Sequence, residues 1–219
     1  MRGSVEEHLL KRLRSERAIH LTLIDPEKVD TKNASEISRI VQSAGSSGIM
    51  IGGSTSTSVH HLDDIVKTVK KTVDIPVILF PNDVTGISQY ADAVFFMSLL
   101  NSSNPYYITG AQALGAPLVK RYALEAISLG YLIVGESGGA AGFIGQARPI
   151  PYEKSELAGI YALAAQYLGM HLVYLEAGSG AEKPVPPEMI RSVKRMIEIP
   201  LVVGGGIRSP QAAMSAVKA

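Results

Sequence analysis

Glycines and carboxylates follow several apolar stretches of this sequence, and their spacing could bind an anion or move a proton. The strongest signal is residues 202–210, where an apolar stretch is followed by three glycines and the start of a helix. Glycines let backbone amides approach an anion, and a helix amino terminus adds positive partial charge. This segment predicts a phosphate-binding loop. The alternative is a glycine turn that needs only positive φ angles.

A second signal is residues 174–181, which read Tyr-Leu-Glu-Ala-Gly-Ser-Gly-Ala. In a strand that ends at this point, side chains alternate, so Tyr174 and Glu176 lie on one side. The Glu176 carboxylate could orient or deprotonate a hydroxyl, while Ser179 and the neighbouring glycine amides could contact an anion. A solvated glutamate in a glycine loop is the alternative. However, a charge at the end of an apolar stretch is costly unless it has a role.

A third signal pairs Asp25, after the first apolar stretch, with Ser54, after the second. Sequential strands usually neighbour each other, which would bring these two oxygen ligands toward one small cation. Magnesium needs few protein ligands when phosphate and water complete its shell, so the pair predicts a magnesium site. The alternative for Asp25 and Pro26 is a plain turn.

The elements that must position these residues are short strands alternating with helices. Apolar stretches of strand length cover residues 19–24, 48–51, 76–80, 93–97, 131–134, 171–175 and 200–203. They are continuous rather than alternating, which is typical of strands covered on both faces of a parallel sheet. Between them, apolar residues recur at spacings of three and four within residues 37–44, 59–69, 157–168 and 189–197, which predicts amphipathic helices.

This order predicts an α/β protein with a parallel sheet, and residues 1–219 read as one domain. An open doubly wound sheet and a closed eightfold barrel both fit the order. A last helix at 210–219 leaves no room for an eighth strand. We therefore expect either a barrel closed by seven strands and an irregular segment, or a chain shortened from a longer protein.

Composition excludes several classes of partner and site. Lys plus Arg number 21 and Asp plus Glu 20, so no global field favours nucleic acid. Cysteine is absent, which excludes disulfides and thiolate metal sites. The first 17 residues are charged and do not resemble a signal peptide, and no apolar stretch approaches membrane-spanning length. We expect a cytoplasmic protein with at most peripheral membrane contact.

Taken in order along the chain, these motifs resemble those of the geranylgeranylglyceryl phosphate synthase family of archaeal lipid enzymes. The matching stretches are residues 23–28, 51–54, 147–151, 174–181 and 203–208. The stretch 174–180, followed by residues 184–190, is highly specific, whereas the triple glycine is shared by many barrels.

The resemblance implies a modified (β/α)8 TIM barrel with its last strand missing from this chain. It implies transfer of a geranylgeranyl group from its diphosphate to the 3-hydroxyl of sn-glycerol 1-phosphate, with Mg²⁺ and release of diphosphate. This reaction would form the first ether bond of archaeal membrane lipids. By motif, Asp25 and Ser54 would bind Mg²⁺ and Glu176 would be the general base. Residues that would hold sn-glycerol 1-phosphate are Tyr174, Leu175, Glu176, Ala177, Gly178, Ser179, Gly180, Gly205 and Gly206. The family also implies a homo-oligomer, either a dimer or a hexamer.

Two departures from the family pattern have consequences for the site. A related branch carries Lys two residues before the magnesium Asp, whereas this chain has Leu23, so some phosphate or diphosphate contacts must come from elsewhere. The family's last strand, which carries a second phosphate-contacting glycine pair, is missing, so we expect part of the phosphate cup to be absent.

The same residues also fit two other functions. One is a different phosphate-binding barrel enzyme, such as a sugar-phosphate isomerase or aldolase, which would not depend on a prenyl diphosphate. The other is a non-catalytic module that binds a phosphorylated metabolite and releases no diphosphate.

Overall fold

The computed structural model describes residues 3–53, 58–136 and 138–219 of the chain. Its internal contacts divide the chain into two compact units. The first comprises Met1–Phe95 and Ala113–Ile127, and the second comprises Phe96–Gln112 and Ser128–Ala219.

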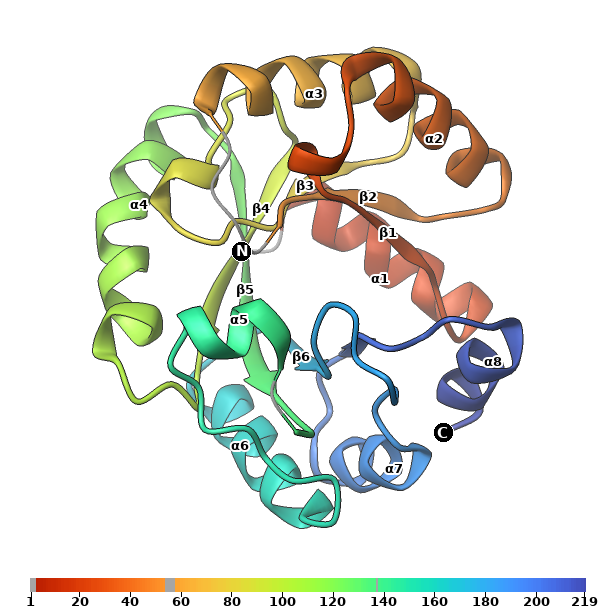
Figure 1. Ribbon diagram of the computed structural model, residues 1–219, viewed down its shortest axis with the longest axis vertical. Coiled ribbons are helices and arrows are strands. Elements are labelled where there is room, and N and C mark those ends of the chain that lie inside the picture. The colour runs from red at the N-terminus through yellow and green to blue at the C-terminus, as the bar shows by residue number, and fades with distance from the viewer. Residues whose placement is uncertain (1–2, 54–57, 137) are drawn as a thin grey trace. The chain divides into compact units, whose positions relative to one another are not determined.

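Parallel strands form the centre of the first unit, where β1 to β3 and the beginning of β4 pair in sequence order. The strands are β1 (Leu21–Ile24), β2 (Gly48–Ile51), β3 (Val77–Leu79) and β4 (Ala93–Leu99). The helices are α1 (Ser4–Glu16), α2 (Thr31–Ser43), α3 (Val59–Thr72) and α4 (Ala111–Arg121). Helices α2 and α3 pack side by side (Figure 1). Every residue of β2 and β3 is buried, which confirms the interpretation of continuous apolar stretches as strands covered on both faces.

The second unit repeats the pattern with β5, β6 and β7, which also pair in parallel and in sequence order. Its strands are β5 (Glu125–Ile133), β6 (Leu172–Glu176) and β7 (Leu201–Gly204). Its helices are α5 (Gly139–Ile144), α6 (Ser155–Tyr167), α7 (Pro187–Met196) and α8 (Pro210–Lys218). Val173 and Leu175 of β6 lie in one buried cluster with Ala162 of α6 and Met189 of α7. The core therefore lies between the strands and α6 and α7, which pack side by side in Figure 1.

Both units contain the same contact, in which a glutamine near the end of one helix binds the turn before a later strand. In the first unit, Gln42 Oε1 accepts the backbone N–H groups of Asp74 at 2.7 Å and Ile75 at 3.3 Å. In the second, Gln166 Oε1 accepts those of Glu198 and Ile199 at the same two distances. The sequence separation to the first partner is 32 residues in both units. Each glutamine thus ties the last turn of one helix to the start of the second strand along the chain.

The structure differs from the sequence-based expectation at three elements. β5 begins at Glu125 rather than at 131, because the Glu125 carboxylate accepts the N–H groups of Val5 and Glu6 and holds this part of the strand against α1. Helix α4 was not predicted, since it contains Pro117 and has only a weak apolar periodicity. The glycine-rich stretch after β5 contains a further short helix, α5.

Candidate active site

Glu176 stands at the carboxyl end of β6, in the second unit. Its side chain is only 7% exposed, and Oε1 accepts the backbone N–H of Gly178 at 2.7 Å. Burial is the main cause that raises the pKa of this carboxyl above its ordinary value. Hydrogen bonds from Gly178, Tyr131 and Tyr174 act in the opposite direction. A carboxylate that is buried, basic and fixed in place is suited to accept a proton from a hydroxyl.

Two tyrosines flank the carboxyl from neighbouring strands. Tyr131 of β5 stands opposite Tyr174 of β6 in the strand register, and their ring centroids lie 5.2 Å apart. Burial and the nearby charge of Glu176 raise the pKa of both hydroxyls, so both stay protonated and can donate to the carboxylate. Tyr131 was not among the residues predicted from the sequence. The signal that could have found it is its position in the strand adjacent to the one that carries Glu176.

Alternation along β6 separates two groups among the predicted substrate-binding residues. Leu175 and Ala177 are buried in the core cluster with α6 and α7. Tyr174 and Glu176 point to the other side of the strand, as predicted. Any contact of Leu175 or Ala177 with a substrate would therefore involve the backbone.

The loops after β6 and β7 approach each other closely, and glycines make this approach feasible. Gly205 has φ +83°, and a Cβ at this position would lie 2.6 Å from Glu176 Oε1 and 2.7 Å from the Gly178 nitrogen. Gly206 has φ +69°, and its Cβ would lie 2.8 Å from the carbonyl group of Lys183. Only glycine combines a positive φ with so little space. The structure thus brings the two predicted glycine segments together beside Glu176.

The preceding residue, Gly204, is restricted by Tyr174. The two residues lie on paired strands, and a Cβ at Gly204 would overlap the Tyr174 hydroxyl. The tyrosine ring therefore occupies the space that a side chain at position 204 would need.

The outer part of the loop after β6 is open. Ser179 and Gly180 are exposed, and no atom of the described residues lies within 4 Å of the position of a Cβ on Gly180. Ala181 donates its N–H to the Gly178 carbonyl at 3.1 Å, so residues 178–181 form a turn. This turn leaves room for an anion beside the backbone.

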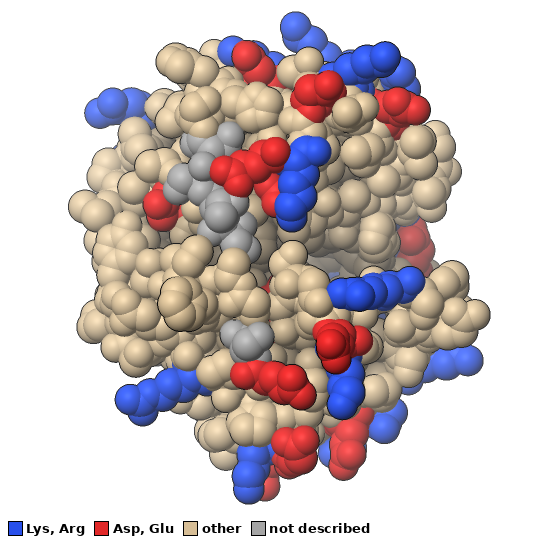
Figure 2. Space-filling model, viewed as in Figure 1, with Lys and Arg blue, Asp and Glu red and all other residues tan. Residues whose placement is uncertain are grey.

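Charges on the face shown in Figure 2 are intermixed rather than gathered by sign. An anion that approached this face would therefore be attracted by individual groups rather than by one large patch. One cation is fixed directly on the turn, since Arg208 Nη2 donates to the Gly180 carbonyl at 2.7 Å.

In the first unit, Asp25 follows β1 and is fixed by its own loop. Its Oδ1 accepts the N–H of Glu27 at 3.1 Å, and its Oδ2 forms an ion pair with Lys28 Nζ at 2.9 Å. Gly53, after β2, lies close enough that a Cβ there would be 2.7 Å from Asp25 Oδ1. Ser54, the second predicted magnesium ligand, lies outside the described residues. Within the described ranges, no group of three or more His, Cys, Asp or Glu could hold a metal ion.

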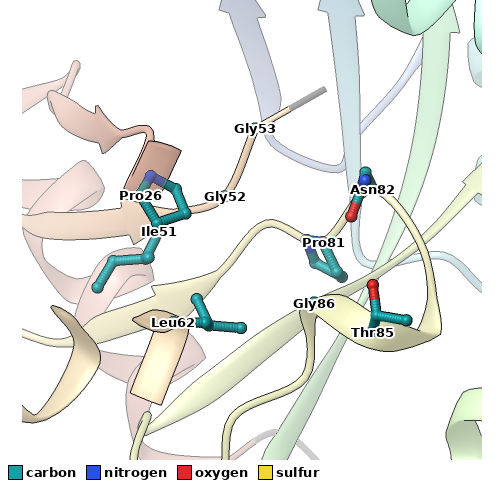
Figure 3. Close-up of a pocket in the computed structure, with 9 residues that line it drawn as sticks. All are labelled: Pro26, Ile51, Gly52, Gly53, Leu62, Pro81, Asn82, Thr85 and Gly86. Carbon is teal, nitrogen blue, oxygen red and sulfur yellow. The ribbon is translucent and has the colours of Figure 1, made fainter. Parts of the chain in front are cut away.

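A small pocket opens between the ends of β1, β2 and β3 (Figure 3). Its lining residues are Pro26, Ile51, Gly52, Gly53, Leu62, Pro81, Asn82, Thr85 and Gly86. The polar side chains of Asn82 and Thr85 contribute hydrogen-bonding groups to a wall that is otherwise apolar or glycine backbone. The pocket therefore adjoins the loop that carries Asp25.

Comparisons with known proteins show the family to which this chain belongs. A model described as the PcrB family matches residues 11–219. The chain belongs to the PcrB family. The geranylgeranylglyceryl phosphate synthase of Thermofilum pendens is 52% identical over 219 residues, covering 100% of this chain and 85% of that protein. The synthase of Thermococcus kodakarensis is 54% identical over 217 residues, covering 99% and 85%.

The solved structure of a similar protein identifies the fold of this PcrB family member. The (S)-3-O-geranylgeranylglyceryl phosphate synthase from Thermoplasma acidophilum, in complex with sn-glycerol-1-phosphate, is 39% identical with a TM-score of 0.93. The similarity covers 99% of this chain and 86% of that one. The chain therefore has the modified (β/α)8 barrel fold that the motifs implied, and seven strands lie within the described residues. The same comparisons confirm the family resemblance and do not favour the isomerase, aldolase or binding-module alternatives.

Proposed function

We propose that this PcrB family member is a magnesium-dependent prenyltransferase. It joins the 3-hydroxyl of sn-glycerol 1-phosphate to geranylgeranyl diphosphate and releases diphosphate. The observation that carries this proposal is the buried Glu176 carboxyl beside two glycine loops, in a chain that matches a sn-glycerol-1-phosphate complex over nearly its whole length.

Glu176 serves as the general base in this proposal. The glycerol oxygen forms a bond to the first carbon of the prenyl group, the bond from that carbon to the diphosphate oxygen breaks, and the hydroxyl proton moves to the Glu176 carboxylate. The bond from the Gly178 N–H fixes Oε1, and the hydroxyls of Tyr131 and Tyr174 orient the carboxyl further. The surrounding burial excludes water that would otherwise compete as the acceptor of the prenyl group.

The glycerol phosphate would lie along the loops after β6 and β7. We assign its binding to Tyr174, Leu175, Glu176, Ala177, Gly178, Ser179, Gly180, Gly205 and Gly206. The geometry supports this assignment, because the open turn at residues 178–181 and the close glycine contacts leave backbone groups next to the carboxylate. Leu175 and Ala177 would contribute through their backbone, since their side chains are in the core.

We assign Mg²⁺ to Asp25, together with Ser54. The chemistry of the donor fits, because Asp25 offers an oxygen ligand at a strand end and magnesium needs only one or two protein carboxylates when phosphates and water complete its shell. When bound, Mg²⁺ would neutralise the leaving diphosphate. Lys28, which is paired with Asp25, adds a second positive charge at the same loop.

Further parts of the proposal concern the whole protein. We expect residues 1–219 to act as one phosphate-binding barrel domain, in a homo-oligomer that is a dimer or a hexamer, in the cytoplasm and with at most peripheral membrane contact. In the part of the chain that the structure describes, no helix is both long and apolar enough to cross a bilayer.

The test is a transfer assay with radiolabelled sn-glycerol 1-phosphate, geranylgeranyl diphosphate and Mg²⁺. We expect label to move into an organic phase, and the transfer to stop with EDTA and with the sn-3 enantiomer. Transfer that persists with EDTA would contradict the role of magnesium. Absence of transfer, in this chain and in one extended to the length of its relatives, would contradict the prenyltransferase proposal.

A further inference from the structure

Arg208 connects the two loops that form the candidate phosphate site. It follows β7 and the glycines at 205 and 206, and directly precedes Ser209, whose hydroxyl accepts the Ala212 N–H and caps α8. The Arg208 guanidinium reaches back to the loop after β6, where Nη2 donates to the Gly180 carbonyl at 2.7 Å. The side chain therefore fixes the turn at residues 178–181 from the loop after the neighbouring strand.

This turn needs an external contact because its backbone is intrinsically permissive. Gly178 and Gly180 both have positive φ angles, +110° and +80°, and glycine loses more conformational freedom on folding than any other residue. On the inner side, Gly178 is held by Glu176 Oε1. On the outer side, Gly180 is exposed and open, and the bond from Arg208 connects it to the loop after β7.

A guanidinium suits this position for two reasons. It carries five N–H donors, so the bond to Gly180 leaves others for an anion, and it is always charged. A hydrogen bond from a charged donor is also stronger than one between neutral groups. Exposure to solvent weakens the attraction but does not remove it.

We propose that Arg208 is a positioning residue that sets the affinity of the site for the phosphate group of its substrate. It holds the turn at residues 178–181 in the shape that presents its backbone to the phosphate, and it adds one positive charge at the edge of the loops. This proposal rests on the proposed function, since it concerns the glycerol phosphate of that reaction. It assigns Arg208 no contact with the reacting atoms.

The effect on catalysis follows from this role. Arg208 bonds to Gly180, whereas Glu176 is held by Gly178 and the two tyrosines, so we expect the chemical step to be unaffected by a change at Arg208 once substrate is bound. We expect Arg208→Gln to raise KM for sn-glycerol 1-phosphate about tenfold, as expected for one charge-assisted hydrogen bond at an exposed site. We expect kcat and KM for the prenyl donor to stay within about twofold, and Arg208→Lys to recover part of the loss because it restores the charge without the planar fork.

The experiment measures binding and turnover in the same set of proteins. Binding of sn-glycerol 1-phosphate is measured by calorimetry on the wild type, Arg208→Gln, Arg208→Lys and the control Arg195→Gln. Arg195 is exposed on α7, so its change removes the same charge from the same unit and leaves the turn intact. Hydrogen exchange of the Ala181 amide reports the order of the turn, and faster exchange is expected only in the Arg208 variants.

Each outcome has a defined meaning. Equal affinity of wild type and Arg208→Gln, or an equal loss in Arg195→Gln, would overturn the proposal. So would a fall in kcat with KM unchanged. If the wild type binds sn-glycerol 1-phosphate, but neither it nor the chain extended to the length of its relatives transfers a prenyl group, the proposed function fails while the binding series still decides the role of Arg208. If the wild type does not bind it, both fail.

Discussion

The substitution Glu176→Gln separates the charge of this side chain from its shape. Glutamine has almost the same volume, and its Oε1 can still accept the Gly178 N–H that Glu176 accepts at 2.7 Å. The amide nitrogen can donate to a neighbouring tyrosine hydroxyl. The loops that hold the phosphate should therefore keep their structure, and only the ability to take a proton is lost.

The expected loss of turnover follows from the role as a general base. Removing such a group typically lowers kcat about 10²- to 10⁴-fold, which corresponds to roughly 3–5 kcal/mol in the barrier. Because the contact with Gly178 survives, we expect KM for sn-glycerol 1-phosphate to change by less than about threefold. The assay is the radiolabel transfer at saturating Mg²⁺ and prenyl donor.

The pH dependence provides a second signature. Burial raises the pKa of Glu176 above its ordinary value of 4.5. Turnover by the wild type should therefore rise with pH as this carboxyl loses its proton, and reach a plateau above the raised pKa. The residual turnover of Glu176→Gln should show no such rise.

The stability of the wild type should fall as pH rises, whereas its turnover should increase. A carboxyl whose pKa is higher in the folded than in the unfolded state binds more protons when folded, so the free energy of unfolding falls as pH rises from 4.5 through the raised pKa. Thermal melts should show Glu176→Gln to be more stable than the wild type at pH 8, with a smaller difference at pH 4. Full turnover by Glu176→Gln would refute the role of Glu176 as a base. If the stability of the variant relative to the wild type were lower at pH 8 than at pH 4, the predicted effect of burial on this carboxyl would be refuted.

Three further substitutions test other parts of the structure. Gly205→Ala forces a side chain into a positive φ and within 2.6 Å of Glu176 Oε1, so we expect a loss of about 1–3 kcal/mol in urea unfolding together with a severe loss of turnover. Gln166→Ala leaves two backbone N–H groups without their acceptor and should lower the free energy of unfolding by about 1–2 kcal/mol, and Gln42→Ala should lower it by a similar amount. A difference above about 1 kcal/mol between the two variants would contradict the equivalence of the two turns. Asp25→Asn should lower turnover at least about tenfold and raise the Mg²⁺ concentration needed for half-maximal rate, while calorimetric affinity for sn-glycerol 1-phosphate stays unchanged; an unaltered Mg²⁺ titration would remove Asp25 from the metal site.

Most strands could be predicted from the sequence because they are short, continuous apolar stretches, although β1 and β7 are only partly buried. β2 and β3 are the clearest cases, since all of their residues are buried. Helix α4 could not be predicted, because it carries Pro117 and its weak apolar pattern gives no clear period. The beginning of β5 was also missed. Glu125 is held there by the amides of α1, far away in sequence.

The candidate site was predictable where function depends on residue type, and unpredictable where it depends on packing. Glu176 stood out as a charge at the end of an apolar stretch. Tyr131 did not, because an aromatic residue in a strand is usually part of the core, and only the register with Tyr174 shows that it faces the carboxyl. The bond from Arg208 to Gly180 likewise depends on how two loops meet.

The Tyr174 hydroxyl fills the space that a Cβ at position 204 would need, so these two positions share one volume. A side chain cannot be added at 204 while the tyrosine ring stays, since a Cβ there would lie 2.7 Å from the Tyr174 ring carbon Cζ even without the hydroxyl. In evolutionary terms, the two positions cannot drift independently. A lineage that gained a side chain at the end of β7 would first have to give up the tyrosine on β6, and with it one hydrogen bond to the carboxyl.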